Sequence, residues 1–135
     1  MLETEKAYIA GIIDGEGSIM LTRLHKNQYH SPCVSIASTD SELLQWVKVT
    51  IGSGKITSKK NYNEEKHKNS YTYTIIYDDA INLLKDIEPY LVISKKKARA
   101  QHIISKYKKV TLRNGRYNEI QKLAKEQFYT DFIAL

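Results

Sequence analysis

The sequence feature that most constrains the fold is a predicted helix with two different faces. Apolar residues recur at helical spacing over residues 4–15, so one face can pack into a core. A second face carries the small residues Ala7, Ala10 and Gly11, three and four positions apart. Because a glycine inside a helix costs about 1 kcal/mol relative to alanine, we expect close packing against another helix to offset it.

This helix runs into the sequence Asp14-Gly15-Glu16-Gly17, directly before a predicted strand. The two glycines are expected to allow a sharp turn. A carboxylate at a helix C-terminus lies in the negative potential of the helix dipole, so the position favours a cation. The Gly15 carbonyl and the Glu16 carboxylate are hard oxygen ligands of the kind that Mg²⁺ binds. An ordinary glycine C-cap followed by an exposed glutamate is the alternative that the spacing leaves open.

The rest of the chain alternates between predicted strands and helices in the order αββαββα, followed by a helical tail. Strand patterns cover residues 18–27, 32–38, 54–60 and 70–76, and a polar segment, 61–69, joins the last two. Predicted helix caps lie at Thr39-Asp40-Ser41-Glu42, at Asp78 or Asp79 and at Ser94, with a last helix near 116–129. The length of 135 residues predicts one α+β domain spanning 1–135.

Composition excludes several classes of protein. The single cysteine, Cys33, excludes an intramolecular disulfide framework, and His25, His30 and Cys33 match no standard zinc-ligand spacing. No apolar run approaches the ~20 residues of a membrane span, so we expect no membrane partner. The acidic N-terminus argues against a signal peptide, which predicts an intracellular protein of a bacterial or archaeal cytoplasm or an organelle.

Positive charge is concentrated in one segment. Residues 89–118 hold nine of the 21 lysines and arginines and no acidic residue, in a chain of net charge +6. On the predicted fourth helix the basic side chains form a stripe, which we call the basic stripe: Lys95, Arg99, His102, Lys106 and Lys109. A basic segment on a near-neutral body predicts a polyanionic partner, with a merely solvated basic helix as the alternative.

The segment Ile9-Ala10-Gly11-Ile12-Ile13-Asp14-Gly15-Glu16-Gly17 resembles the LAGLIDADG motif that names a family of homing endonucleases. Five of the nine positions are identical to the name. Further similarity lies in segments 38–44, 51–56, 71–75 and 87–91, and it reaches about residue 108. The resemblance implies the αββαββα unit, with a four-stranded antiparallel sheet that forms a DNA-binding saddle, followed by C-terminal helices.

The resemblance also implies an activity. Such a protein cleaves both strands of a long, near-palindromic DNA site by Mg²⁺-dependent phosphodiester hydrolysis. Glu16 would bind the metal together with the Gly15 carbonyl. A chain with one motif is expected to act as a homodimer, with Ala7, Ala10, Gly11 and Asp14 at the helix interface, since two cuts need two carboxylate sites.

One position departs from the family pattern. Many relatives carry a lysine where this chain has Ser94, and Lys95 could replace that lysine if the register shifts by one residue. The departure leaves open a family member that binds nucleic acid without cutting it, either an RNA-splicing maturase or a DNA-binding regulator. A structural or protein-interaction domain is the third hypothesis, which the basic stripe and the motif order disfavour.

Strand alternation predicts which residues face the DNA, because successive side chains point to opposite faces of a sheet. Arg23 and His25 have the opposite parity and are set aside. Lys96, Lys97 and Arg99 are added as phosphate contacts. The sheet residues predicted to contact DNA are Ser18, Met20, Thr22, Leu24, Cys33, Ser35, Lys55, Thr57, Lys59, Ser70, Thr72 and Thr74.

Overall fold

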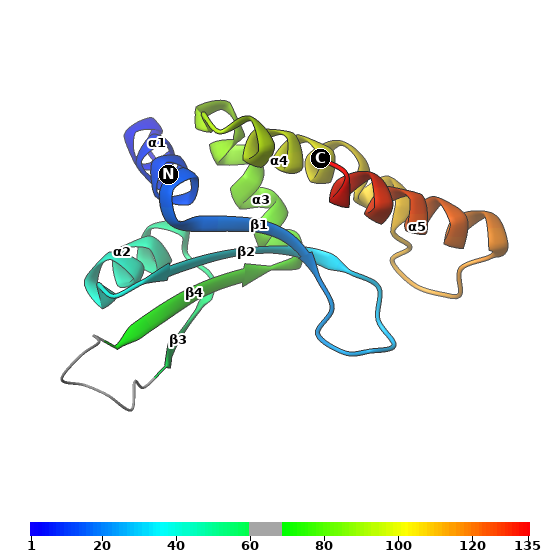
Figure 1. Cartoon of the computed structure of the whole chain (residues 1–135), viewed down its shortest axis with the longest axis horizontal. Coiled ribbons are helices and arrows are strands. Elements are labelled where there is room, and N and C mark those ends of the chain that lie inside the picture. The colour runs from blue at the N-terminus through cyan, green and yellow to red at the C-terminus, as the bar shows by residue number, and fades with distance from the viewer. Residues whose placement is uncertain (60–68) are drawn as a thin grey trace.

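Four antiparallel strands form one sheet in the order β1-β2-β4-β3 in the computed structural model, which describes residues 1–59 and 69–135 (Figure 1). The strands are β1 (Gly17–Thr22), β2 (Ser31–Ser38), β3 (Lys55–Lys59) and β4 (Ser70–Ile76). The helices are α1 (Glu3–Glu16), α2 (Ser41–Ile51), α3 (Tyr77–Ile87), α4 (Ser94–Lys106) and α5 (Glu119–Ile133), with short 3-10 turns η1 (Glu88–Tyr90) and η2 (Lys108–Val110). The predicted α+β class and element order are confirmed. The polar segment predicted for 61–69 falls almost wholly outside the described residues.

The core lies between one face of the sheet and the helices α1, α2, α3 and α4 (Figure 1). Alternate strand residues, among them Ile19, Val34 and Ile75, are almost fully buried there. Tyr73 is also fully buried, and its hydroxyl donates a hydrogen bond of 2.7 Å to the Ser53 carbonyl. Gly54 lies against that ring with φ +106°, and a Cβ there would come within 2.4 Å of it. This position therefore requires glycine on steric and conformational grounds.

Two sequence-based expectations about element ends are wrong. The strand expected over 18–27 ends at Thr22, and residues 23–30 form a loop before β2. No side chain caps the N-terminus of α2, α3 or α4, so the predicted caps do not form. Tertiary contacts stabilise these helices instead. Asn118 and Gln121 do form a reciprocal capping box at the start of α5.

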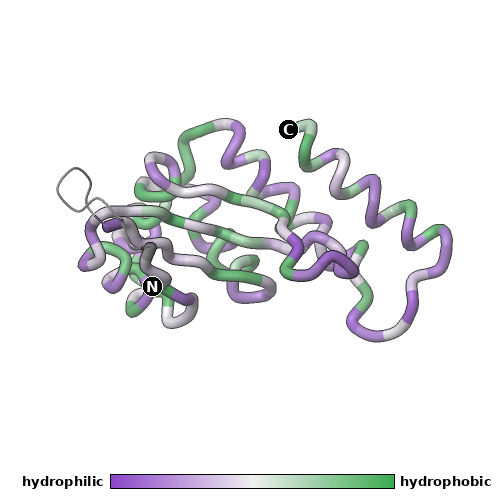
Figure 2. The backbone as a smooth tube through the Cα atoms, turned by 60° about the horizontal axis from the view of Figure 1, so that its bottom comes forward, coloured by the Kyte–Doolittle hydropathy of each residue, from purple (hydrophilic) through white to green (hydrophobic). Residues whose placement is uncertain are grey.

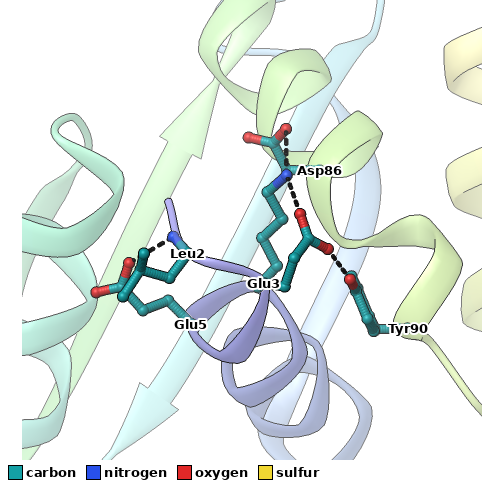
Figure 3. Close-up of polar contacts among 6 residues, drawn as sticks. Leu2, Glu3, Glu5, Asp86 and Tyr90 are labelled. Carbon is teal, nitrogen blue, oxygen red and sulfur yellow. Dashed lines mark hydrogen bonds and ion pairs between the residues drawn. The ribbon is translucent and has the colours of Figure 1, made fainter.

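The N-terminal end of α1 is fastened to neighbouring elements (Figure 3). Glu3 accepts a hydrogen bond from the Tyr90 hydroxyl of η1. Lys6 bridges the carboxylates of Glu3, at 3.1 Å, and Asp86 of α3, at 3.9 Å. The Glu5 carboxylate accepts a hydrogen bond from the backbone of Leu2, at 2.7 Å. These contacts position α1 relative to the core.

Helix α5 lies alongside α4, beyond the αββαββα unit (Figure 1). Hydrophobic and hydrophilic residues alternate along it, as expected of a helix that buries one side (Figure 2). The buried side includes Phe128 and Phe132, with exposed fractions of 4% and 2%. None of the helices within the described residues combines the length and apolarity needed to cross a bilayer.

Candidate cleavage site and nucleic-acid interface

Glu16 is the last residue of α1, and its side chain is exposed. Gly17 starts β1 with an extended backbone, φ −99°, and a Cβ there would lie 2.7 Å from the Ile13 Cα. The glycine is therefore needed for the close approach of strand to helix, and no left-handed turn is involved. The helix delivers Gly15 and Glu16 to the surface at the point where the sheet begins.

Asp14 and Lys96 stabilise this end of α1 from within the protomer. The Asp14 carboxylate accepts hydrogen bonds from the backbone N–H groups of Val92, at 2.9 Å, and Ile93, at 3.2 Å. The Lys96 ammonium donates to the Ile13 and Asp14 carbonyls, both at 2.7 Å. A cation at a helix C-terminus satisfies otherwise unpaired carbonyls and complements the dipole. Lys96 is therefore a helix cap in this structure, and its contact with phosphate stays a prediction.

Two more predicted phosphate contacts are also engaged internally. Lys97 lies 3.6 Å from the Glu88 carboxylate and donates to the Glu88 carbonyl at 3.3 Å. Arg99 donates to the Ile19 carbonyl of β1 at 3.2 Å, and its guanidinium carbon lies 4.9 Å from the centre of the Phe132 ring. These contacts engage both cations within their own chain, and their role as DNA contacts stays a prediction.

The basic stripe, called the α4 stripe from here on because most of it lies on α4, is partly covered by α5. Within the stripe, His102 is 8% exposed, stacks on Phe128 at 4.6 Å and lies 3.0 Å from the Phe128 carbonyl. Lys95 and Lys106 remain exposed, and Lys95 forms no hydrogen bond or ion pair among the described residues. Ser94 is the exposed first residue of α4. The sequence pattern therefore located the stripe only in part, because Lys109 lies beyond α4 in η2 and the fold uses the centre of the stripe for packing.

The sheet face opposite the helices, here called the open face, carries the polar residues predicted from strand alternation. Its register aligns Ser18, Ser35, Thr74 and Lys55 in a row across all four strands. Ser18 and Lys55 are exposed, and the other two are half-buried. On the same face lie Met20, Thr22, Ala37, Thr57, Ser70 and Thr72. Ala37 was missed because its small apolar side chain gives no signal.

Two predicted contacts on this face differ from expectation. Cys33 has the expected parity but is only 6% exposed, and burial raises the pKa of its thiol. Leu24 is exposed, but it lies in the loop after β1 rather than on a strand. It lines a hollow of about 380 Å³ with Lys55, Thr57 and Thr74. The side chain of Lys59 lies outside the described residues.

Two of the four residues predicted for the small face of α1 do not lie on its exposed side. Ala10 is fully buried in the protomer core, and Asp14 is turned toward Val92, so neither forms an exposed interface position. The small exposed residues are instead Ala7, Gly11 and Gly15, spaced four apart. A Cβ at Gly11 or Gly15 would meet no heavy atom within 4 Å among the described residues. No packing inside the described protomer therefore requires these two glycines.

The structure supplies only some of the ligands that a divalent metal needs. Among the described residues, no group of three or more His, Cys, Asp or Glu side chains could hold an ion. Glu16 offers one exposed carboxylate and Gly15 one carbonyl. Mg²⁺ is commonly held by one or two carboxylates and keeps water and substrate phosphate as its other ligands. This oxygen pair is compatible with such an ion.

Comparison with known proteins agrees with the geometry. The family model described as "LAGLIDADG-like domain" matches residues 3–111, and the chain belongs to this family. No curated protein sequence matches it at a significant level.

Solved structures share the fold at low sequence identity. The homing endonuclease I-CvuI in complex with its target is 14% identical with a TM-score of 0.70, covering 98% of this chain and 82% of that one. An archaeal intron-encoded homing endonuclease, I-Vdi141I, complexed with DNA is 15% identical with a TM-score of 0.54, covering 98% and 99%. The LAGLIDADG homing endonuclease I-GzeII in complex with a DNA target is 19% identical with a TM-score of 0.70, covering 96% and 44%.

Proposed function

We propose that this protein is a homing endonuclease that binds a long, near-palindromic double-stranded DNA site as a homodimer and cuts both strands. The observation that carries the proposal is the position of Glu16. Its exposed carboxylate lies at the end of α1, two residues before Ser18, which begins the polar row across the open face. The whole chain, 1–135, would act as one domain. The DNA complexes of the structural neighbours support the same function.

The open face supplies what DNA recognition requires. Hydroxyl groups of Ser18, Ser35 and Thr74 can donate to or accept from base edges, and Lys55 can contact a phosphate. In the part of the chain that the structure describes, the helices lie on the other side of the sheet, so this face can take a partner (Figure 1). Recognition would therefore be spread over the sheet, while the Glu16 carboxylate lies at one end of it.

At the cleavage site, Glu16 and the Gly15 carbonyl would hold Mg²⁺, which supplies Lewis-acid activation of water and neutralises charge on the phosphate. Asp14 and Lys96 position the end of α1 without contacting the reacting atoms. Since one protomer contributes one such carboxylate, cleavage of two strands needs a second copy. Contact between two α1 helices through Ala7, Gly11 and Gly15 would bring the two sites to the same interface.

The first test separates cleavage from binding. Glu16→Gln keeps the side-chain shape but removes the charge, so cleavage should fall at least about 100-fold, while affinity for the target stays close to that of the wild type. Target sites come from sequencing the ends of a randomised DNA pool cut in Mg²⁺. Gel-shift assays in Ca²⁺ then measure affinity. Glu126→Gln, an exposed glutamate on α5, is the control. A Glu16→Gln variant that cuts at the wild-type rate would contradict the metal-ligand assignment.

The second test concerns the dimer. Gly11→Leu places a large side chain on the exposed stripe of α1, so it should dissociate the dimer while the protomer stays folded. Light scattering measures the mass, and circular dichroism checks the fold. Ala124→Leu enlarges an exposed alanine on α5 in the same way and should leave the dimer intact. A wild-type monomer that cuts both strands would disprove this part of the proposal.

A second candidate function rests on Ser94. This exposed serine replaces a lysine expected from the family resemblance, and the ammonium of nearby Lys96 is already bound to α1. Such a chain could bind DNA or RNA without cutting it. Wild-type protein that binds selected DNA but leaves it intact in Mg²⁺, together with recovery of cleavage in Ser94→Lys, would favour this candidate.

A further inference from the structure

The loop between β1 and β2, residues 23–30, extends the open face at the end farthest from Glu16. It contains Arg23, His25 and Lys26 and no acidic residue, and all three side chains are exposed. The six residues of β1 separate it from Glu16, which is about 20 Å of extended chain. That distance corresponds to about six base pairs of DNA at 3.4 Å per step. A cationic loop at this place can contact only the outer part of a half-site.

Few contacts inside the loop hold its shape. Arg23 donates to the Lys26 carbonyl at 3.3 Å, and the Gln28 N–H donates to the His25 carbonyl at 3.1 Å. Both contacts join residues only three positions apart. The conformation of the loop therefore depends on what its C-terminal end contacts.

That end packs against α5. The His30 ring stacks on the Tyr129 ring, with centroids 3.9 Å apart and planes inclined by 16°. Tyr29 contacts Tyr117, in the connection to α5, at 4.9 Å between centroids. A hollow of about 370 Å³ lies between the loop and α5, lined by residues of both. Two adjacent loop residues are thus fastened to the C-terminal part of the chain.

Lys125 of α5 joins these contacts at their centre. It is only 4% exposed, and its ammonium lies 4.4 Å from the centre of the Tyr107 ring, 5.7 Å from Tyr29 and 5.9 Å from Tyr117. It also donates a hydrogen bond to the Thr111 hydroxyl. Ring faces attract a cation, and the attraction is stronger when the cation has lost its water. One buried cation therefore draws together the loop, the end of α4 and the connection to α5.

Helix α5 is in turn fixed to the core. Phe128 stacks on His102 of α4, and Phe132 lies beneath the Arg99 guanidinium, which is bound to β1. The family model ends at residue 111, so family membership assigns no role to α5. A continuous set of contacts thus runs from the core through α5 to the loop.

We propose that Tyr129 and Lys125 are positioning residues that hold loop 23–30 for recognition of the outer base pairs of each DNA half-site. This inference rests on the proposed DNA-binding function. Neither residue needs to touch DNA. Their effect is on base preference at positions about six base pairs or more from the centre of the DNA site. The polar residues of the open face read the inner positions.

The experiment compares the wild type with Tyr129→Leu and Lys125→Met, neither of which changes the loop itself. Leu123→Ala is the matched control, because it shortens an exposed side chain of α5. Each protein selects bound sites from a DNA pool randomised over the whole half-site. Thermal unfolding confirms that each variant is folded at the assay temperature. In parallel, trypsin cleavage after Arg23 and Lys26 is timed in the DNA-free protein.

We expect preference at the outer positions to fall about fivefold or more in both variants, because a lost base-edge contact removes about tenfold discrimination. Inner preferences should persist, and trypsin should cut the loop several times faster. Leu123→Ala should match the wild type. Uniform weakening at all positions, or an unchanged rate of trypsin cleavage, would overturn the inference and leave the proposed function standing. A wild type without any base preference would overturn the proposed function and the inference with it.

Discussion

The α4 stripe and the open face of the sheet both carry regularly spaced polar residues, but helix α5 covers the centre of the stripe, while the open face has residues exposed on both of its edge strands. In the stripe, Arg99 and His102 are covered by α5. On the open face, Ser18 and Lys55 stay exposed. The difference shows that a basic helix can meet its hydrogen-bonding and charge requirements within its own chain. A density of positive charge predicts a polyanion site only where the cations are left without internal partners.

The lysine pair at the start of α4 gives the largest expected difference. Lys96→Met removes two charge-assisted hydrogen bonds to the end of α1 and should lower the free energy of unfolding by about 3 kcal/mol. Lys95→Met removes an exposed ammonium and should change it by less than about 0.5 kcal/mol. Urea unfolding measures both. Equal effects of the two substitutions would show that the cap does not stabilise the protein.

A pH series tests whether the Lys125 ammonium is buried in the folded state. Burial lowers the pKa of Lys125 to about 8, from an ordinary value of 10.5, because the ammonium loses its hydration. Between these two values the unfolded chain binds the extra proton, so the stability of the folded state rises with pH. Relative to Lys125→Met, the wild type should gain about 2 kcal/mol between pH 7 and 9.5.

The neighbouring tyrosines limit the upper end of that series. Burial raises the pKa of Tyr107, so above about pH 10 the unfolded chain loses its tyrosine proton first and stability falls again. The comparison is therefore made below pH 10, by urea unfolding at each pH. A difference between wild type and variant that stays constant from pH 7 to 9.5 would contradict a lowered lysine pKa.

The smallest expected effect separates the two regions directly. Lys55→Met should reduce the slope of log K for DNA against log salt by about 1.8, because the proposed homodimer loses one phosphate contact from each of its two chains. Arg99→Met should leave the slope unchanged, because its guanidinium is bound to the Ile19 carbonyl and to Phe132. Fluorescence anisotropy across a salt series measures both slopes. A reduced slope for Arg99→Met, with none for Lys55→Met, would reverse the assignment.

Local patterns were sufficient for the framework of the fold. Apolar residues repeating at helical spacing located α1, and alternation located β2 and β4, because those periods are imposed by backbone geometry. The same alternation placed Ser35 and Thr74 on one face of the sheet. The glycine and acid pattern at the end of α1 identified Glu16 as a candidate metal ligand. All of these inferences depend on residues close together in sequence.

Tertiary structure decided which polar and small residues are covered. Ala10 has a small side chain like Ala7, but it faces the core, and Lys96 resembles Lys95 but binds the end of α1. These outcomes depend on contacts between segments about 80 residues apart, such as Lys96 with Asp14 at a separation of 82. Helix α5 begins 13 positions after the end of α4 and converts part of a basic stripe into a packing surface. The sequence thus determined the elements and the candidate carboxylate, while long-range packing determined which faces remain free for a partner.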